Sequence, residues 1–153
     1  MKRDVTLGPL YRLIYCSRST LAAGADADRA LRALLATARW RNEADQLTGA
    51  LLASPSGFAQ VLEGPRDAVE RRFQRISVDP RHTEVSMLTL TPTSRRLFPD
   101  SPLAFCGHIA AGGEDPLTGL LEDTRRGDQR AITGTDVLRQ LVRLVRAAEA
   151  PPA

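Results

Sequence analysis

Seven segments with strand or helix periodicity follow one another along this chain, in the order strand, helix, strand, strand, helix, strand, strand. The strand-like segments cover residues 10–16, 47–53, 58–63 and 84–91, with a weaker one at 103–109, and the helical segments cover 27–42 and about 65–78. The turn sequence Ser54 to Gly57 joins the second and third strands as a hairpin. This order predicts an α+β fold with a ferredoxin-like βαββαββ sheet and both helices on one face.

Apolar residues lie on both faces of the first strand, which indicates a sheet that is covered on both sides. The second cover is expected from C-terminal helices. Residues 116–126 suggest a short helix, and residues 136–149 form a longer amphipathic one. Its expected apolar stripe consists of Leu138, Leu141, Val142 and Val145, and the arginines on the opposite side are Arg139, Arg143 and Arg146. The longer helix is expected to pack on the second sheet face or to form a dimer contact. We expect two parts, a domain over residues 1–110 and a helical extension over 111–153.

The bulk properties exclude several classes of protein. No apolar run reaches the roughly 18 residues of a membrane span, and the N-terminus carries no secretory signal pattern, so a cytoplasmic protein is expected. A formal net charge of +3 is too weak to predict nucleic-acid binding. Cys16 and Cys106 have no metal-ligand spacing and are expected to be reduced, buried thiols.

One polar residue stands where an apolar one is expected. In the strand 58–63, Gln60 shares a face with Phe58 and Leu62, which indicates that this face is buried. An unpaired buried amide costs about 1–3 kcal/mol, so Gln60 is held by its own protein or binds a polar ligand.

The predicted topology makes the first and third strands central neighbours. Tyr15 and Gln60 then lie side by side, and Asn42 reaches the same face from the end of the first helix. The walls of the slot between the two helices are expected to be apolar side chains: Leu34, Leu51, Phe58 and Ile76. An apolar slot with converging donors and acceptors suits a planar heteroaromatic ring.

The sequence resembles the BLUF domains, blue-light sensors that use a flavin. The resemblance covers about residues 10–105 and is carried by motifs in order: Tyr11 to Ser17 (YRLIYCS), Arg41-Asn42, Leu47-Thr48-Gly49, Gly57 to Pro65 (GFAQVLEGP), Ile76, Asp79 to His82 (DPRH), and Arg95 to Asp100 (RRLFPD).

The resemblance implies a role for each matching residue. Tyr15 is the expected electron and proton donor to the excited flavin, Gln60 the residue that switches, and Asn42 the partner of the pyrimidine edge. The four wall residues are ring contacts, and three further residues lie near the flavin edge and tail: Arg75, Asp79 and His82. The cofactor implied is FAD, with FMN as the alternative because the chain has no strong phosphate motif. Light is expected to leave Gln60 in a changed tautomer or orientation and to shift the absorption to the red.

Two positions depart from the family pattern. Leu103 stands where a methionine is expected, and Ser101 stands where a tryptophan often occurs. Leucine fills a similar volume but cannot accept a hydrogen bond as the methionine sulfur does. Both residues are therefore expected to affect signalling more than flavin binding. The single tryptophan, Trp40, is expected either to pack at the surface or to act near the ring.

Alternatives to a photoreceptor remain open at this point. An acylphosphatase-like enzyme would use Arg18 in a loop after the first strand, but the loop lacks that family's glycine spacing. RNA binding would need exposed aromatic residues on an open sheet. A third alternative is a BLUF-fold interaction module that binds flavin without photoswitching. For a sensor, the short C-terminal part has no room for a catalytic domain, so we expect no enzyme, a homo-oligomer formed through the C-terminal helices, and a separate effector protein.

Overall fold

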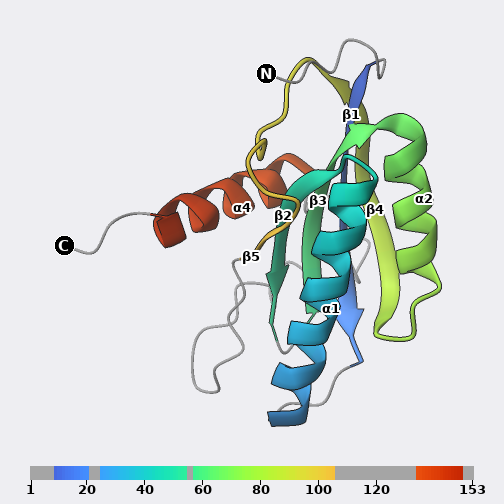
Figure 1. Ribbon diagram of the computed structural model, residues 1–153, viewed down its shortest axis with the longest axis vertical. Coiled ribbons are helices and arrows are strands. Elements are labelled where there is room, and N and C mark those ends of the chain that lie inside the picture. Colours follow the sequence, from blue (N-terminus) through green and yellow to red (C-terminus); the bar gives the residue numbers. More distant parts are fainter. Residues whose placement is uncertain (1–8, 21–24, 55–56, 106–133, 150–153) are drawn as a thin grey trace.

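The computed structural model describes residues 9–20, 25–54, 57–105 and 134–149 of this chain, and its elements follow the predicted order (Figure 1). They are β1 (Leu10–Ser19), α1 (Ala25–Ala44), β2 (Thr48–Ala53), β3 (Gly57–Pro65), α2 (Arg66–Ser77), β4 (His82–Thr93), β5 (Ala104–Phe105) and α4 (Gly134–Glu149). The predicted helix over 116–126, Cys106 and the expected strand beyond residue 105 lie outside the described residues.

The five strands form one sheet in the order β4-β1-β3-β2-β5. The strands β1 to β4 pair with one another antiparallel, and the short β5 runs parallel to β2. This order confirms the ferredoxin-like α+β fold and the prediction that β1 and β3 are neighbours. Their register places Tyr15 directly opposite Gln60.

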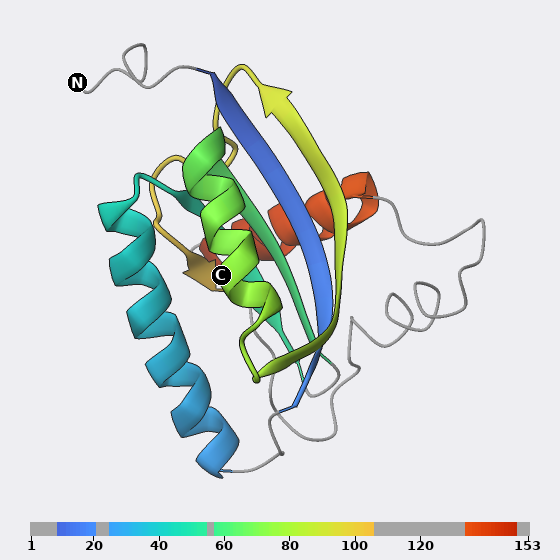
Figure 2. The same cartoon turned by 90° about the vertical axis from the view of Figure 1, so that its right-hand side faces the viewer.

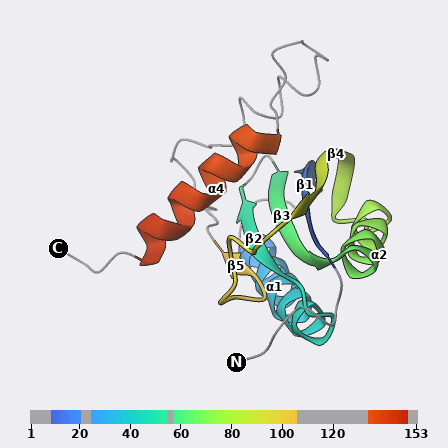
Figure 3. The same cartoon turned by 90° about the horizontal axis from the view of Figure 1, so that it is seen from above.

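Helices cover both faces of the sheet. Figures 2 and 3 show α1 and α2 on one face and α4 on the other. Alternation along β1 explains how one strand serves both layers. Leu13 and Tyr15 belong to the cluster under α2, whereas Ile14 and Cys16 belong to the cluster under α4.

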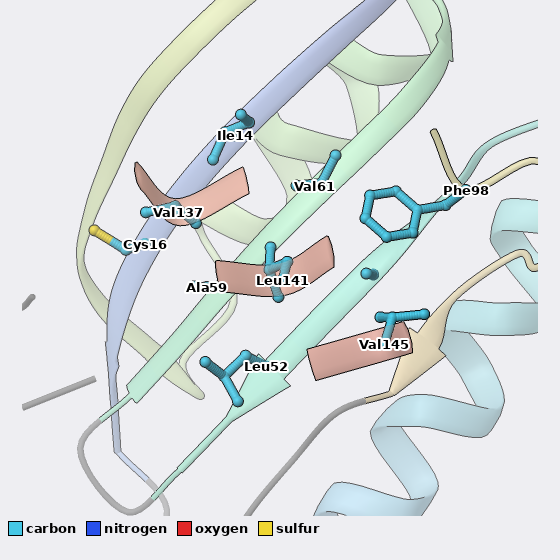
Figure 4. Close-up of a cluster of buried hydrophobic side chains, with 10 residues drawn as sticks. Ile14, Cys16, Leu52, Ala59, Val61, Phe98, Val137, Leu141 and Val145 are labelled. Atoms are coloured by element: carbon cyan, nitrogen blue, oxygen red, sulfur yellow. The ribbon is translucent and has the colours of Figure 1, made fainter. Parts of the chain in front are cut away.

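The amphipathic C-terminal helix packs on the second face of the sheet, which was the first of its two expected roles. Val137, Leu141 and Val145, spaced four residues apart, are the α4 side chains buried in this cluster (Figure 4). The buried row differs from the predicted stripe. Leu138 and Val142, which were expected in the stripe, lie at the edge of the cluster and are only partly buried. Each fully buried side chain of this size contributes about 1.5–3 kcal/mol. Together these contacts hold α4 against the sheet.

A buried carboxylate fixes the segment between β4 and β5. Glu63, on β3, is fully buried and pairs with Arg12 on β1, with 2.8 Å between Oε2 and Nε. The same carboxylate accepts from the backbone N–H groups of Leu97 and Phe98, each at 2.9 Å. Charge-assisted bonds of this kind are stronger than neutral ones. Glu63 therefore sets where the chain turns towards Leu103.

Among the described residues, no helix combines the length and the apolar character that a membrane crossing requires.

Candidate functional site

A cavity of about 110 Å³ lies between α1, α2 and the sheet. All the predicted site residues except Ser101 line this cavity: Tyr15, Leu34, Asn42, Leu51, Phe58, Gln60, Arg75, Ile76, Asp79, His82 and Leu103. Five lining residues were not predicted: Thr37, Ala38, Arg41, Arg72 and Arg81. We call this cavity the slot.

Tyr15 and Gln60 form a hydrogen-bonded pair in the slot. The Tyr15 hydroxyl donates to Oε1 of Gln60 over 2.5 Å, and the two side chains are 1% and 5% exposed. Burial, and then the negative charge of Asp79, raise the pKa of Tyr15 far above its ordinary value. The phenol therefore keeps its proton at neutral pH. Because this bond uses Oε1, the amide NH₂ group of Gln60 can donate to a ligand.

Asn42 carries a buried acceptor that lacks a partner. Its Nδ2 donates to the carbonyl oxygen of Pro102 over 2.9 Å, and the residue is fully buried. Across the described part of the chain, Oδ1 of Asn42 has no hydrogen-bond partner. Such an acceptor costs about 1–3 kcal/mol unless a ligand satisfies it. The expected flavin fits this polar set, since its ring has one N–H donor for Asn42 and carbonyl acceptors for Gln60.

His82 closes one side of the slot as a neutral ring. Its centroid lies 4.6 Å from that of Phe58, and its Nδ1 is 2.8 Å from Oγ of Ser17. Burial lowers the pKa of His82 to about 4. Ser17 was quoted in the sequence motif without a role, although strand alternation places it on the same face as Tyr15. The motif and the alternation together could have found this contact.

Asp79 stands at the end of α2 in a tight pair with Arg81. Nη2 of Arg81 lies 2.6 Å from Oδ2 of Asp79, and Nε lies 3.0 Å from Oδ1. The hydrogen bonds from Arg81 lower the pKa of Asp79. The carboxylate is therefore charged at neutral pH and keeps acceptor capacity at the edge of the slot.

The two departures from the family pattern occupy different places. Leu103 is 1% exposed and lines the slot together with Leu51 and Phe58. Ser101 does not line the slot. Its Oγ accepts from the N–H of Leu103 at 3.2 Å, and the residue borders a separate cavity beside α4. Leu103 is thus a wall residue, whereas Ser101 supports the segment that carries it.

Arg72 is the main residue that the sequence reasoning missed. It is 8% exposed, and its Nη2 pairs with Oδ2 of Asp45 at 3.2 Å. Helical spacing could have revealed it, because Arg72 precedes Arg75 by three residues and Asp79 by seven.

Trp40 is 72% exposed and lies outside the slot. Arg18 was expected in a loop but lies within β1, where its Nε pairs with Oε2 of Glu84 at 2.6 Å.

Comparison with known proteins agrees with this geometry. The model of the family described as "BLUF: Sensors of blue-light using FAD" matches residues 10–104. Subunit beta of a photoactivated adenylate cyclase from Euglena gracilis is 44% identical over 69 residues, which is 45% of this chain but only 8% of that protein.

Solved structures show the same fold over almost the whole chain. The dark-state structure of BlrB, a BLUF protein, is 31% identical with a TM-score of 0.67, covering 92% of this chain and 97% of that one. Klebsiella pneumoniae BlrP1, solved with FMN and cyclic diGMP, is 27% identical with a TM-score of 0.60, covering 91% of this chain and 35% of that one. On the match over residues 10–104, this chain belongs to the BLUF family of blue-light sensors that use a flavin.

Proposed function

We propose that this protein is a blue-light receptor that binds FAD in the slot and signals through the Tyr15–Gln60 pair without turning over a substrate. The observation that carries the proposal is the buried bond from the Tyr15 hydroxyl to Oε1 of Gln60. FMN is the alternative cofactor.

Different residues of the slot bind different parts of the flavin ring. Asn42 accepts the ring N–H through its unpartnered Oδ1, and Gln60 donates to a carbonyl edge through its NH₂ group. Apolar side chains from α1, α2 and the sheet cover the ring faces: Leu34, Leu51, Phe58, Ile76 and Leu103. Arg75, Asp79 and His82 serve the remaining edge and the start of the tail.

When bound, the flavin absorbs blue light and becomes a strong oxidant. Tyr15 would then supply one electron to the excited ring and its hydroxyl proton to the amide of Gln60. Because burial disfavours the phenolate, the proton would not leave before the electron, and it would pass along the bond to Gln60. Both return to Tyr15, so no net reaction occurs. Gln60 is left in a changed tautomer or orientation, which alters what it donates into the slot and shifts the absorption to the red.

The output in this proposal is a protein contact. Residues 1–110 form the flavin-binding part, and residues 111–153 form an extension that joins copies of the chain and meets a separate effector. The contact between α4 and β3, the strand that carries Gln60, supports a route from the slot to this extension.

A second candidate is favoured by one observation. Leu103 fills the slot wall with a side chain that cannot accept a hydrogen bond, where the family pattern has methionine. The alternative is therefore a BLUF-fold module that binds flavin but does not switch.

The deciding experiment is the visible spectrum of the FAD-loaded protein in the dark, after blue light and during dark recovery. We expect a reversible red shift that Tyr15→Phe and Gln60→Leu abolish while flavin stays bound. Tyr11→Phe is the matched control, because Tyr11 lies on the same strand but outside the slot, against Arg66. A bound flavin without any shift would select the second candidate.

A further inference from the structure

A cavity of about 150 Å³ lies between α4 and the segment that leads into β5. Its apolar lining includes Phe98 and Val145, which are buried and belong to the cluster under α4. In Figure 4 these two side chains lie at the end of the cluster nearest β5. Leu97 and Val142 continue the apolar surface on the segment and on the helix. The cavity therefore has apolar walls from two elements, and we call it the α4 cavity.

The size of the α4 cavity suits one aromatic molecule. Ser101 borders it with a small side chain, at the position where the family pattern often has tryptophan. Its Oγ accepts the N–H of Leu103 at 3.2 Å, so the hydroxyl already serves the backbone. Apolar cavities of roughly 150 Å³ in other proteins bind a molecule such as benzene. A planar aromatic molecule can thus fill the volume that the small side chain of Ser101 leaves open.

Two charged side chains of opposite sign line the same cavity. Asp100 and Arg146 are both exposed, so they border it on its solvent side. A carboxylate accepts a strong hydrogen bond from a ring N–H. A guanidinium is attracted to the face of an aromatic ring, and most strongly to that of an indole. The lining therefore favours an aromatic ligand with an N–H donor over a hydrocarbon of the same shape.

We propose that the α4 cavity is a binding site for a small heteroaromatic molecule of the indole class, separate from the flavin site. The ring lies against the apolar walls, its N–H donates to Asp100, and Arg146 covers one face. Among the described residues, the α4 cavity and the slot share no lining residue, so the site needs neither light nor switching. Ser101 is bonded to Leu103, a wall residue of the slot, so the bound molecule would touch the segment that joins the two sites.

The test is calorimetric titration of the FAD-loaded full chain with indole and with indene, which has the same shape but no N–H group. FAD fills the slot, so neither probe can enter it. We expect indole to bind at least about tenfold more tightly, through one hydrogen bond to a charged group. Ser101→Trp should abolish the binding of both probes by filling the cavity. Ser94→Trp, which adds the same side chain at an exposed position outside both cavities, should leave it unchanged.

Asp100→Ala separates recognition from packing. The variant loses the acceptor and keeps the apolar walls, so the preference for indole should disappear while indene binds as before. Glu43→Ala, which removes an exposed carboxylate outside both cavities, is the control. Equal affinities for indole and indene in the unchanged chain, or indole binding that survives in Ser101→Trp, would overturn the inference. The absence of binding by both probes would do the same, and none of these results would affect the photoreceptor proposal.

Discussion

Asn42 joins helix α1 to the segment before β5, because its Nδ2 donates to the Pro102 carbonyl over 2.9 Å. Arg39, one turn earlier on the same helix, donates from Nε to the carbonyl of Leu103 at 3.0 Å. The helix that supplies the amide proposed to bind the ring therefore also holds the wall residue at the family's methionine position. A displacement of α1 on flavin binding would reach Leu103 through these two bonds.

Asn42→Leu should separate flavin binding from apoprotein stability. The substitution loses the bond to Pro102 but also removes the unpartnered Oδ1, so the free energy of unfolding of the apoprotein should change by less than about 1.5 kcal/mol. The flavin affinity should fall at least about tenfold, because the ring N–H loses its acceptor. Urea denaturation and flavin titration measure the two effects, with Glu43→Gln on the exposed side as control. An unchanged affinity would remove Asn42 from the ring site.

Leu103→Met tests whether the missing sulfur limits the photocycle. The swap nearly conserves volume, so the cost in stability should stay below about 1.5 kcal/mol, whereas Leu103→Ala should cost about 2–5 kcal/mol by leaving a cavity. The sulfur gives the Gln60 amide a weak acceptor, so dark recovery of Leu103→Met should slow several-fold after blue light. Recovery at the wild-type rate would show that the side chain at position 103 does not contact the switching amide.

Glu63→Gln should destabilise the fold far more than the same change on the surface. The substitution leaves Arg12 without its buried counter-charge and weakens the bonds to the loop N–H groups, at a cost of about 3 kcal/mol. Glu70→Gln is the matched control, because Glu70 pairs with Arg66 on the exposed side of α2 and such pairs contribute about 0.3–0.5 kcal/mol. Equal losses in urea denaturation would contradict the assigned role of Glu63.

Stability should fall as the pH drops from about 6.5 towards 4. The pKa of His82 is about 4 in the folded protein, below its ordinary value of 6.5, so the unfolded chain binds a proton first in this range. The contribution of neutral His82 is complete above pH 6.5 and is lost as the pH falls through 4. Its upper limit is about 3 kcal/mol.

His82→Gln isolates this effect, because it removes the titrating ring and keeps a hydrogen-bond partner for Ser17. The variant should show a flatter stability profile between pH 4 and 6.5 in urea denaturation. An unchanged slope would assign the pH dependence to other groups. The carboxyl of Asp79 does not interfere, since its pKa is lowered from 3.8 and its effect falls below this window.

Strand alternation made much of the site predictable. Once β1 and β3 were placed as neighbours, the period of two put Tyr15 and Gln60 on the same face, and the register of the structure places them directly opposite each other. The apolar walls followed for the same reason. The resemblance to the family added the roles of Tyr15, Gln60 and Asn42, and it added Arg75, Asp79 and His82 to the site.

Long charged side chains explain why a buried arginine was overlooked in the sequence. Arg72 has the hydropathy of a surface residue, yet its apolar stem lies in the interior while Nη2 reaches Asp45. Val137 was missed because the apolar residues of α4 form a broad band, and a row through Val137, Leu141 and Val145 fits helical spacing as well as the predicted stripe does. Which stripe is central depends on the shape of the sheet face, set by residues distant in sequence such as Ile14 and Val61.

The strand β3 contributes side chains to both faces of the sheet, so the slot and the cluster under α4 lie very close together. Gln60 faces the slot, whereas its chain neighbours Ala59 and Val61 pack into the cluster under α4. The two compartments are thus separated by a partition one residue thick, and each side is built on the same peptide units. A small rotation of the backbone at Gln60 moves side chains in both compartments at once. Communication across this domain needs no long route, because the two faces are the front and back of a single strand.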